Sequence, residues 1–450
     1  MIKEKKYLID FMQKFSKNSS YKIIQYSDNG TYPKLEYDIA PDYELREYDV
    51  LNAETEQEVI DIIVNNPQVD AIVTYSPNES TVFEYLCNHL SDEYKRKWYH
   101  YNDYENHGNE LGPLINYSIV EHYSAPFFSI TTPLYKTNPK YFYNAYESLK
   151  DNIFRDWEWV LVDDSPEPLT WVQEYLKQLK DIRVKYYRVE PISSGCIGAT
   201  KWRANCLSKG KWLLEFDHDD EIPWWGLQEM YNGIQMYPDA GFIYSDDAPI
   251  DGNDNFQGYT YGDEYGLGYG YPYLSDEPNG KFQFIGNRDS DINQSAIRHI
   301  VGVPNHIRCW KREIYFKVGG HNTSLRIADD YELVVRTWLE APFIHVNAPC
   351  YYQRFDGGNS QDAGNNRADI QRRVRWISNY YNQRIHDKII ELGGVEDDWN
   401  PNDSFDTMHR YYGVPDIQSF NYVYTPEWEH YPFQVTAKQA KEYRERMGTN

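Results

Sequence analysis

The sequence predicts an α/β protein with a mixed, mainly parallel sheet that is covered by helices on both faces. From residue 126 onward, short apolar runs typical of strands alternate with longer segments of helical periodicity. Two of the apolar runs end abruptly in acids, at Asp163-Asp164 and at Asp217-His218-Asp219-Asp220. Because ligands of such sheets bind beyond the carboxyl ends of the strands, we expect both acidic clusters to line a binding site.

The first 120 residues predict a small α/β module of unknown role. Residues 21–27 favour a strand, and the capping box Thr55-x-x-Glu58 predicts the start of a helix. Residues 69–75 favour a second strand. Acceptor recognition, oligomerisation and a decayed second domain are all compatible with such a module.

Residues 126–394 predict the larger domain. Its expected elements are strand 127–130, a helix that carries Phe142, Ala145 and Leu149 on one face, strand 157–162, helix 170–180, strand 182–188, helix 198–208, strand 212–216, a helix from Asp329, strand 343–347 and helix 366–390. The first strand is expected to break at Thr131-Thr132-Pro133, since proline cannot donate to a sheet.

Two further segments are predicted to lie outside this pattern. Residues 241–295 favour an inserted hairpin and loop, rich in Gly and Tyr over 257–273. That loop would act as a mobile lid, or it would pack on itself as ordinary surface. Residues 395–450 predict a C-terminal helical arm, with a final helix near 436–447, that wraps on the body or on a second subunit of a homo-oligomer.

Charge and cysteine content exclude several classes of protein. The chain has 450 residues, with 45 Lys and Arg against 69 Asp and Glu, so its formal net charge is −24. This excess disfavours nucleic acid and anionic membrane surfaces as partners. Five scattered cysteines without CxxC spacing indicate reduced thiols rather than zinc or disulfide sites. The sequence has no apolar run long enough for a membrane span and no secretory signal, so we expect a cytoplasmic location.

The clearest chemical signal is Asp217-x-Asp219. Two carboxylates on a tight turn can bind a hard divalent cation and leave coordination positions for water and phosphate oxygens. A cation held there would make a nucleoside diphosphate a competent leaving group. The alternative is that these acids cap the next helix, with Pro223 as its first residue. Their position after an apolar strand, in step with Asp163-Asp164, favours the metal site.

An ordered series of short motifs runs from about residue 126 to residue 360. It comprises Thr132-Pro133-Leu134-Tyr135, D-W-E-x-x-x-V-D-D-S at 156–165, a Gly-led helix at 198–204, the segment 210–220, Tyr244-Ser-Asp-Asp247, Pro304-Asn-His306-Ile-Arg308-Cys-Trp310, Val318-Gly-Gly-His-Asn322, Ala328-Asp-Asp-Tyr-Glu-Leu333 and Arg354-Phe-Asp-Gly-Gly-Asn-Ser360. Each match alone is weak, but the ordered series covers roughly half of the chain. In this order the motifs resemble those of the family 2 glycosyltransferases of the GT-A fold.

The resemblance implies a donor site for a nucleotide sugar. Thr132 and Pro133 would shape the pocket for the nucleotide base, and Asp163 or Asp164 would hydrogen-bond uracil or ribose. Lys201, on the Gly-led helix, would contact the diphosphate. The simplest donor of this kind is a UDP-sugar.

The resemblance also implies a metal site and a catalytic base. Asp217 and Asp219 would hold Mn²⁺ or Mg²⁺, and Asp217 would thereby belong to the donor site as well. Asp330 matches the family's base, which would take the proton of the acceptor hydroxyl on the face opposite the leaving group. Asp330 equally suits the first turn of a helix, and the two roles are compatible.

The acceptor side and the third metal ligand are less closely defined. Many relatives place His where this chain has Asp356, and an aspartate there would complete the metal site or leave it without a third protein ligand. Asp329, Arg308 and Trp224 are expected on the acceptor side, where Trp224 would stack on a sugar or pack in the core. His306 is given no firm role.

Together these matches imply a metal-dependent, inverting glycosyltransferase that moves a hexose from a nucleotide sugar to a hydroxyl of a glycan or glycoconjugate. One alternative is a sugar nucleotidyltransferase, but no Gly-rich phosphate loop with a basic residue follows strand 127–130. The other is a non-catalytic glycan-binding or structural protein on the same fold, which would need neither Asp330 nor a metal. The sugar, the acceptor and the linkage depend on loop shape, which the motifs do not define.

Overall fold

The computed structural model describes residues 21–27, 48–75, 81–101, 125–179, 181, 183–190, 192–193, 195–257, 272–279, 283–289, 291–293, 296–299, 303–356, 366–396, 399–400 and 421–428. The chain divides into two compact units. The first unit consists of residues 1–129, 158–194 and 203–211, and the second of residues 130–157, 195–202 and 212–450. This division follows contacts in space rather than chain order, so the boundaries expected at residues 120 and 394 stay predictions.

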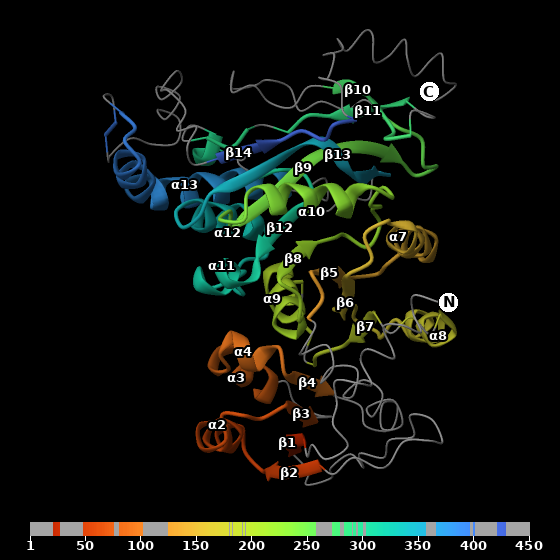
Figure 1. Cartoon of the computed structure of the whole chain (residues 1–450), viewed down its shortest axis with the longest axis vertical. Coiled ribbons are helices and arrows are strands. Elements are labelled where there is room, and N and C mark those ends of the chain that lie inside the picture. Colours follow the sequence, from red (N-terminus) through yellow and green to blue (C-terminus); the bar gives the residue numbers. More distant parts are fainter. Residues whose placement is uncertain are drawn as a thin grey trace. The chain divides into compact units, whose positions relative to one another are not determined.

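The first unit contains a parallel four-stranded sheet near the N-terminus. Its strands lie in the order β2 (Tyr48–Ala53), β1 (Tyr21–Ser27), β3 (Ala71–Tyr75) and β4 (Trp98–Tyr101). Helix α2 (Glu56–Asn65) packs on β1 and β2 beside α3 (Thr81–His89), which the short α4 (Asp92–Lys95) follows (Figure 1). Thr55 Oγ1 accepts a hydrogen bond from the backbone N–H of Glu58, as the capping box predicts. The two predicted strands and the predicted helix are present, and β2 is an additional strand between the first strand and the helix.

The same unit contains β6 (Trp157–Asp163), α8 (Thr170–Leu179) and β7 (Val184–Tyr187), with β6 and β7 parallel. The end of α9 (Ile197–Leu207) and the residues after it connect these elements with the N-terminal sheet. Arg203 Nη2 lies 2.8 Å from Glu84 Oε1, and Lys209 Nζ donates to the carbonyl oxygens of Lys95 and Trp98 at 3.0 and 2.6 Å. These buried contacts give the first 120 residues a polar anchor on the chain segment after residue 202.

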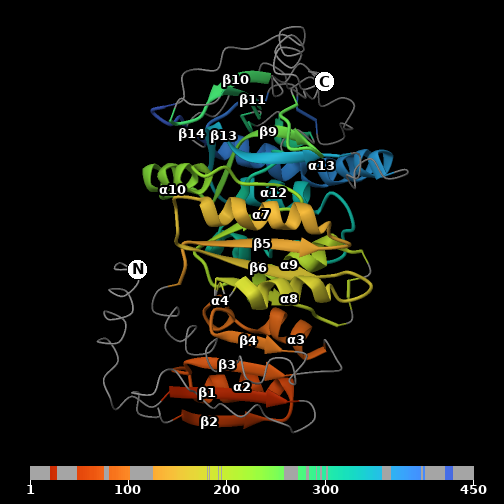
Figure 2. The same ribbon diagram turned by 90° about the vertical axis from the view of Figure 1, so that its right-hand side faces the viewer.

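The second unit is built on a mixed sheet. Its strands lie in the order β10 (Pro272–Asp276), β11 (Gln283–Asn287), β9 (Phe242–Asp251), β12 (Arg308–Lys311), β8 (Trp212–Glu215) and β5 (Phe128–Leu134). The long β13 (Phe343–Phe355) pairs in parallel with β9 and with β14 (Asn421–Tyr424), and Figure 2 shows these three strands close together. Strand β12 runs antiparallel to both of its neighbours. The predicted α/β class with a mixed sheet is confirmed.

Helices cover the sheet of the second unit. They are α7 (Pro139–Asp151), α10 (Gly226–Met236), α11 (Arg312–Lys317), α12 (Asp329–Trp338), α13 (Asn366–Glu391) and the 3-10 turn η1 (Ala296–Arg298). Helix α10 packs along β9 and β13, α11 packs on β8 and β12, and α12 packs against α13. Trp225, Trp310 and Trp338 are fully buried among these layers. Among the described residues, no helix combines the length and apolar character that a bilayer crossing requires.

Three sequence expectations need correction. Strand β5 does not break at Thr131 but continues to Leu134, because Pro133 lies one residue before the strand end, where a missing N–H costs little. Helix α10 begins at Gly226, so the alternative in which the acids before Pro223 cap this helix is wrong. Part of the expected helical arm is a strand, β14, which extends the main sheet. The expected loop over 258–271 and helix near 436–447 lie outside the described residues.

Candidate active site

The predicted metal ligands Asp217 and Asp219 lie on the turn that follows β8. The backbone N–H of Asp217 donates to Tyr351 Oη at 3.1 Å, and Arg354 Nε donates to the carbonyl oxygen of Asp219 at 2.7 Å. Both anchors come from β13. The side chains of Asp217 and Asp219 keep 38% and 37% of their surface exposed. The backbone of the turn is therefore fixed while its two carboxylates stay open to solvent.

Asp220 points inward from the same turn and locks it to β13. Its carboxylate accepts hydrogen bonds from Tyr351 Oη at 2.8 Å and from the backbone N–H of Arg354 at 2.7 Å. Burial and the neighbouring carboxylates of Asp219 and Asp217 raise the pKa of Asp220 well above its ordinary value. Asp220 thus serves the geometry of the turn rather than a ligand.

The donor set on this turn fits a divalent cation held by two carboxylates. Burial raises the pKa of Asp219, and Asp217 and Asp356 raise it further by repulsion, although His218 opposes them. A cation would relieve that repulsion and would use the hard oxygen ligands that Mn²⁺ and Mg²⁺ accept. No three His, Cys, Asp or Glu side chains of the described ranges are arranged to hold a metal. Asp356, which is exposed after β13, stays a predicted third ligand.

A buried network of charges connects β8, β12 and α12. Glu215, the last residue of β8, lies 2.7 Å from His321 Nε2, 3.0 Å from Arg308 Nε and 3.3 Å from Lys201 Nζ. Lys201 Nζ also lies 3.3 Å from Asp329 Oδ2. Together, Lys201 and Arg308 hold the pKa of Glu215 well below its ordinary value against the effect of burial. The ammonium group of Lys201 is taken up by two protein carboxylates, which favours a structural role over the predicted contact with the diphosphate.

Asp330 stands in the first turn of α12 beside this network. Helix α12 begins at Asp329, as the sequence predicts. Arg308 Nη1 lies 2.5 Å from Asp330 Oδ2, and the Asp330 side chain keeps 29% of its surface exposed. Burial raises the pKa of Asp330, but Arg308 and Lys201 outweigh it and lower the pKa below the ordinary value. The result is an ionised carboxylate that solvent, or a substrate, can reach.

His306 joins the acids of the turn to the Asp330 side of the site. Its Nε2 atom lies 3.3 Å from Asp217 Oδ2 and 3.0 Å from Arg308 Nη2. The imidazole is buried and stacks on Tyr351, with ring centroids 4.9 Å apart. Burial and Arg308 lower the pKa of His306, although Asp217 opposes them, so the neutral ring is favoured. Asp217, His306, Arg308 and Asp330 therefore form one continuous chain of contacts.

Asp163 and Asp164 end β6 in the first unit, where protein groups already bind both carboxylates. Asp163 accepts hydrogen bonds from the backbone N–H of Ser165 at 2.9 Å and from Tyr186 Oη at 2.6 Å. Asp164 accepts from the backbone N–H and Oγ of Ser193 at 2.5 and 2.6 Å. The two acids are buried, unlike a solvated turn. Their contact with uracil or ribose stays a prediction.

Thr132, Pro133 and Trp224 belong to the second unit. Thr132 and Pro133 lie near the end of β5, the strand beside β8. Trp224 packs edge-on against Trp225, with ring centroids 5.3 Å apart, at the border of an apolar cluster that includes Phe284. This placement favours the alternative in which Trp224 packs in the core. The stacking of Trp224 on an acceptor sugar stays a prediction.

Two members of the charged network carry no role in the sequence-based predictions. Glu215 is an acid in the apolar run Trp212–Phe216, and an acid in a buried strand must be paired. That pattern was a usable signal for Glu215. His321 lies in the motif Val318–Asn322 of the series, which singled out the segment but gave the histidine no role.

Residues 129–292 match the family model described as Glycosyl transferase family 2. This segment belongs to glycosyltransferase family 2. The matched range begins in β5 and includes the acids after β6, the Asp217–Asp219 turn and β9 to β11. Arg308, Asp329 and Asp330 lie beyond it, so their functional assignment depends on the geometry described above and on the motif resemblance.

Relatives of this chain include proteins described as glycosyltransferases. It is 25% identical over 238 residues to an uncharacterized glycosyltransferase of Haemophilus influenzae, which covers 52% of this chain and 70% of that protein. It is 25% identical over 196 residues to the putative colanic acid biosynthesis glycosyl transferase WcaA of Escherichia coli, which covers 44% and 61%. Across four curated relatives, the chain spans 14% to 70% of their length.

Among solved structures, the chain is similar to S. aureus TarS 1-349 in complex with UDP-GlcNAc. The TM-score is 0.41 at 15% sequence identity, and the match covers 58% of this chain and 71% of that chain.

Proposed function

We propose that this protein is a metal-dependent, inverting glycosyltransferase that moves a hexose from a UDP-sugar to a hydroxyl group of a glycan or glycoconjugate. The observation that carries the proposal is the chain of contacts from Asp217 through His306 and Arg308 to Asp330. It connects Asp217, one of two open carboxylates suited to a metal and a diphosphate, with an ionised carboxylate suited to accept a proton. A protein that only bound glycans would not require that combination.

On the donor side, Asp217 and Asp219 would hold Mn²⁺ or Mg²⁺. When bound, the cation neutralises the diphosphate and makes it a good leaving group. His306 contacts the Asp217 carboxylate, and Tyr351 and Arg354 fix the backbone of the turn, so both carboxylates project from a set position in the fold. Thr132, Pro133 and either Asp163 or Asp164 are the proposed contacts of the nucleotide.

On the acceptor side, Asp330 would take the proton of the acceptor hydroxyl. The hydroxyl oxygen forms a bond to the anomeric carbon while the bond from that carbon to the diphosphate oxygen breaks, and the proton moves to the Asp330 carboxylate. Attack on the face opposite the leaving group inverts the anomeric configuration. Arg308 and the N-terminal end of α12 keep Asp330 ionised and in place before the reaction.

The low pKa of Asp330 predicts a pH profile. An acid whose folded-state pKa is depressed stays ionised until the pH falls through that lowered value, so the acidic limb that Asp330 gives to the kcat/KM profile should lie below the ordinary pKa of an aspartate. Arg308→Lys weakens the pairing that lowers this pKa while it keeps a positive charge. We expect the acidic limb of the kcat/KM profile to move to higher pH in this variant.

The control for this profile is Arg312→Lys, which replaces another buried arginine at the start of α11. Its acidic limb should match that of the wild type. Unchanged limbs in both variants would show that Arg308 does not set the pKa of the group that controls the rate.

Turnover of a panel of UDP-sugars tests the proposed function. We expect UDP release from at least one of UDP-glucose, UDP-galactose and UDP-N-acetylglucosamine in the presence of Mn²⁺, with water or an added glycoside as acceptor. EDTA should abolish it, and the product released from an α-linked donor should have the β configuration by NMR. An α product would refute inversion, and full activity in EDTA would refute the metal requirement.

A further inference from the structure

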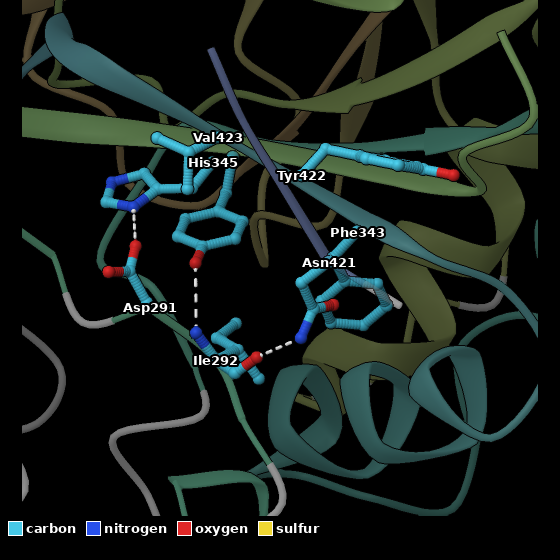
Figure 3. A pocket seen from close by; sticks show the side chains of 8 residues that line it. Asp291, Ile292, Phe343, His345, Asn421, Tyr422 and Val423 are labelled. Carbon is cyan, nitrogen blue, oxygen red and sulfur yellow. Dashed lines mark hydrogen bonds and ion pairs between the residues drawn. The ribbon is translucent and has the colours of Figure 1, made fainter. Parts of the chain in front are cut away.

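A cavity of about 270 Å³ lies on β9, β13 and β14, outside the contacts described for the donor and the base. Its apolar side is formed by Phe343 and Val423, and its polar side by Asp291, His345 and Asn421 (Figure 3). Pockets for small ligands usually combine apolar walls with a few polar groups and begin at roughly 300 Å³. The size of this cavity therefore suits one sugar ring rather than an oligosaccharide.

The register of the strands places this cavity on the same face of the sheet as Glu215 and Arg308 of the buried network of charges. Glu215 stands opposite Arg308, Arg308 opposite Tyr244, and Tyr244 opposite His345. Directly opposite residues on neighbouring strands project to the same face. The rings of Tyr244 and His345 confirm this, since they stack with centroids 4.6 Å apart. With strands about 4.8 Å apart, His345 lies roughly 10 Å along the sheet from Arg308, which holds Asp330.

Hydrogen bonds also connect the cavity with the segment that contains Asn305 and His306. His345 Nε2 lies 2.7 Å from Asp246 Oδ1, which also accepts from the backbone N–H of Asp289 at 2.9 Å. Asp289 Oδ2 accepts from the backbone N–H of Asn305 at 3.1 Å. Asn305 directly precedes His306. A chain of hydrogen bonds therefore links the cavity to the segment that holds Asp217 and Asp330.

The polar side of the cavity offers hydrogen-bonding groups, and its charged side chains are already paired with one another or with Arg288. Asp291 lies 2.6 Å from His345 Nδ1 and 2.8 Å from Arg288 Nη2. Asn421 donates to the carbonyl oxygen of Ile292, while Asn421 Oδ1 is buried without a partner among the described residues. Figure 3 shows Asp291 beside His345 and Asn421 facing Ile292. A buried acceptor without a donor favours a ligand that brings one, such as a hydroxyl group.

We propose that this cavity is an acceptor subsite, which binds one neutral sugar unit next to the unit whose hydroxyl reacts. The assignment rests on the proposed glycosyltransferase function and adds the class of acceptor to it. The CH faces of the sugar pack on Phe343 and Val423, and one of its hydroxyls donates to Asn421 Oδ1. A carboxylated sugar is disfavoured, because Asp291 is already at the cavity and its cationic neighbours are engaged.

Val423 offers a way to close the cavity without touching the charged groups. Its side chain lines the cavity, yet 47% of its surface is exposed, so a larger residue there need not disturb the core. Val423→Trp would fill the cavity, and Val423→Thr is the matched control of equal shape. The ligands are methyl β-glucoside, methyl β-galactoside and methyl N-acetyl-β-glucosaminide, with glucuronate as the charged comparison, and binding is measured by saturation-transfer NMR.

We expect at least one neutral glycoside to bind the wild type and Val423→Thr, and to bind Val423→Trp about tenfold more weakly. Glucuronate should bind more weakly than the neutral glycosides. The subsite is refuted if no neutral glycoside binds, if Val423→Trp binds it as well as the wild type, or if glucuronate binds equally tightly. Binding of UDP with Mn²⁺, followed by calorimetry in the same samples, should be equal in all three proteins. Its absence from the wild type would refute the proposed function instead.

Discussion

Asp330→Asn should lower kcat by about 10²- to 10⁴-fold and leave the affinity for UDP nearly unchanged. The substitution keeps the shape of the side chain and removes the group that accepts the proton. Asp330 makes no proposed contact with the nucleotide, and its carboxylate binds Arg308 and the backbone N–H of Tyr331. Steady-state rates of UDP release and calorimetric titration with UDP, both with Mn²⁺ present, separate the two effects.

The matched control for this variant is Glu313→Gln. Glu313 is an exposed acid in the first turn of another helix, α11, so its substitution removes the same charge from a similar position. It should leave both kcat and UDP affinity unchanged. If Asp330→Asn lost UDP affinity to the same extent as activity, Asp330 would belong to the donor site and would not be the base.

Glu215→Gln should destabilise the protein by about 3–5 kcal/mol, because it removes a buried carboxylate that two buried cations share. Arg308 and Lys201 both pair with Glu215, and both are almost fully buried. The glutamine amide can replace a hydrogen bond but not the charge. The free energy of unfolding, measured by urea denaturation at pH 7, reports this loss directly.

Two comparisons isolate the buried pairing. Glu340→Gln removes an acid from the exposed pair with Lys317 and should change stability by no more than about 1 kcal/mol. Combining Glu215→Gln with Lys201→Met removes one carboxylate charge and one ammonium charge together, so the double variant should be more stable than the sum of the single effects predicts. Equal effects of Glu215→Gln and Glu340→Gln would show that the network contributes little to stability.

The features of the site that depend on neighbouring residues in the chain were predictable from the sequence. The acids after β6 and β8 follow apolar runs, so the positions of Asp163 and Asp217 at strand ends could be inferred from the alternation of strands and helices. The start of α12 at Asp329 followed from the same reasoning. Hydrophobic periodicity and the residue types at strand ends are local patterns of a few residues. They can therefore be recognised in a single sequence.

The network around Glu215 could not be inferred in the same way. Lys201, Arg308 and His321 approach Glu215 from segments 14, 93 and 106 residues away along the chain. Only the antiparallel register of β12 with β8 brings Arg308 opposite Glu215. The motif resemblance predicted that Lys201 contacts the diphosphate. In the fold, Lys201 instead pairs with two acids.

The proposed function depends most on Asp217 and Asp219, which we propose to bind a nucleoside diphosphate through a metal. Calorimetric titration with UDP tests it most directly, on the wild type and on the Asp217→Ala/Asp219→Ala variant, first with Mn²⁺ and then with EDTA. We predict that the wild type binds UDP with Mn²⁺, that EDTA weakens this binding at least about tenfold, and that the variant shows no metal-dependent binding. UDP binding that is equal with Mn²⁺ and EDTA, or that the double variant retains, would contradict the account.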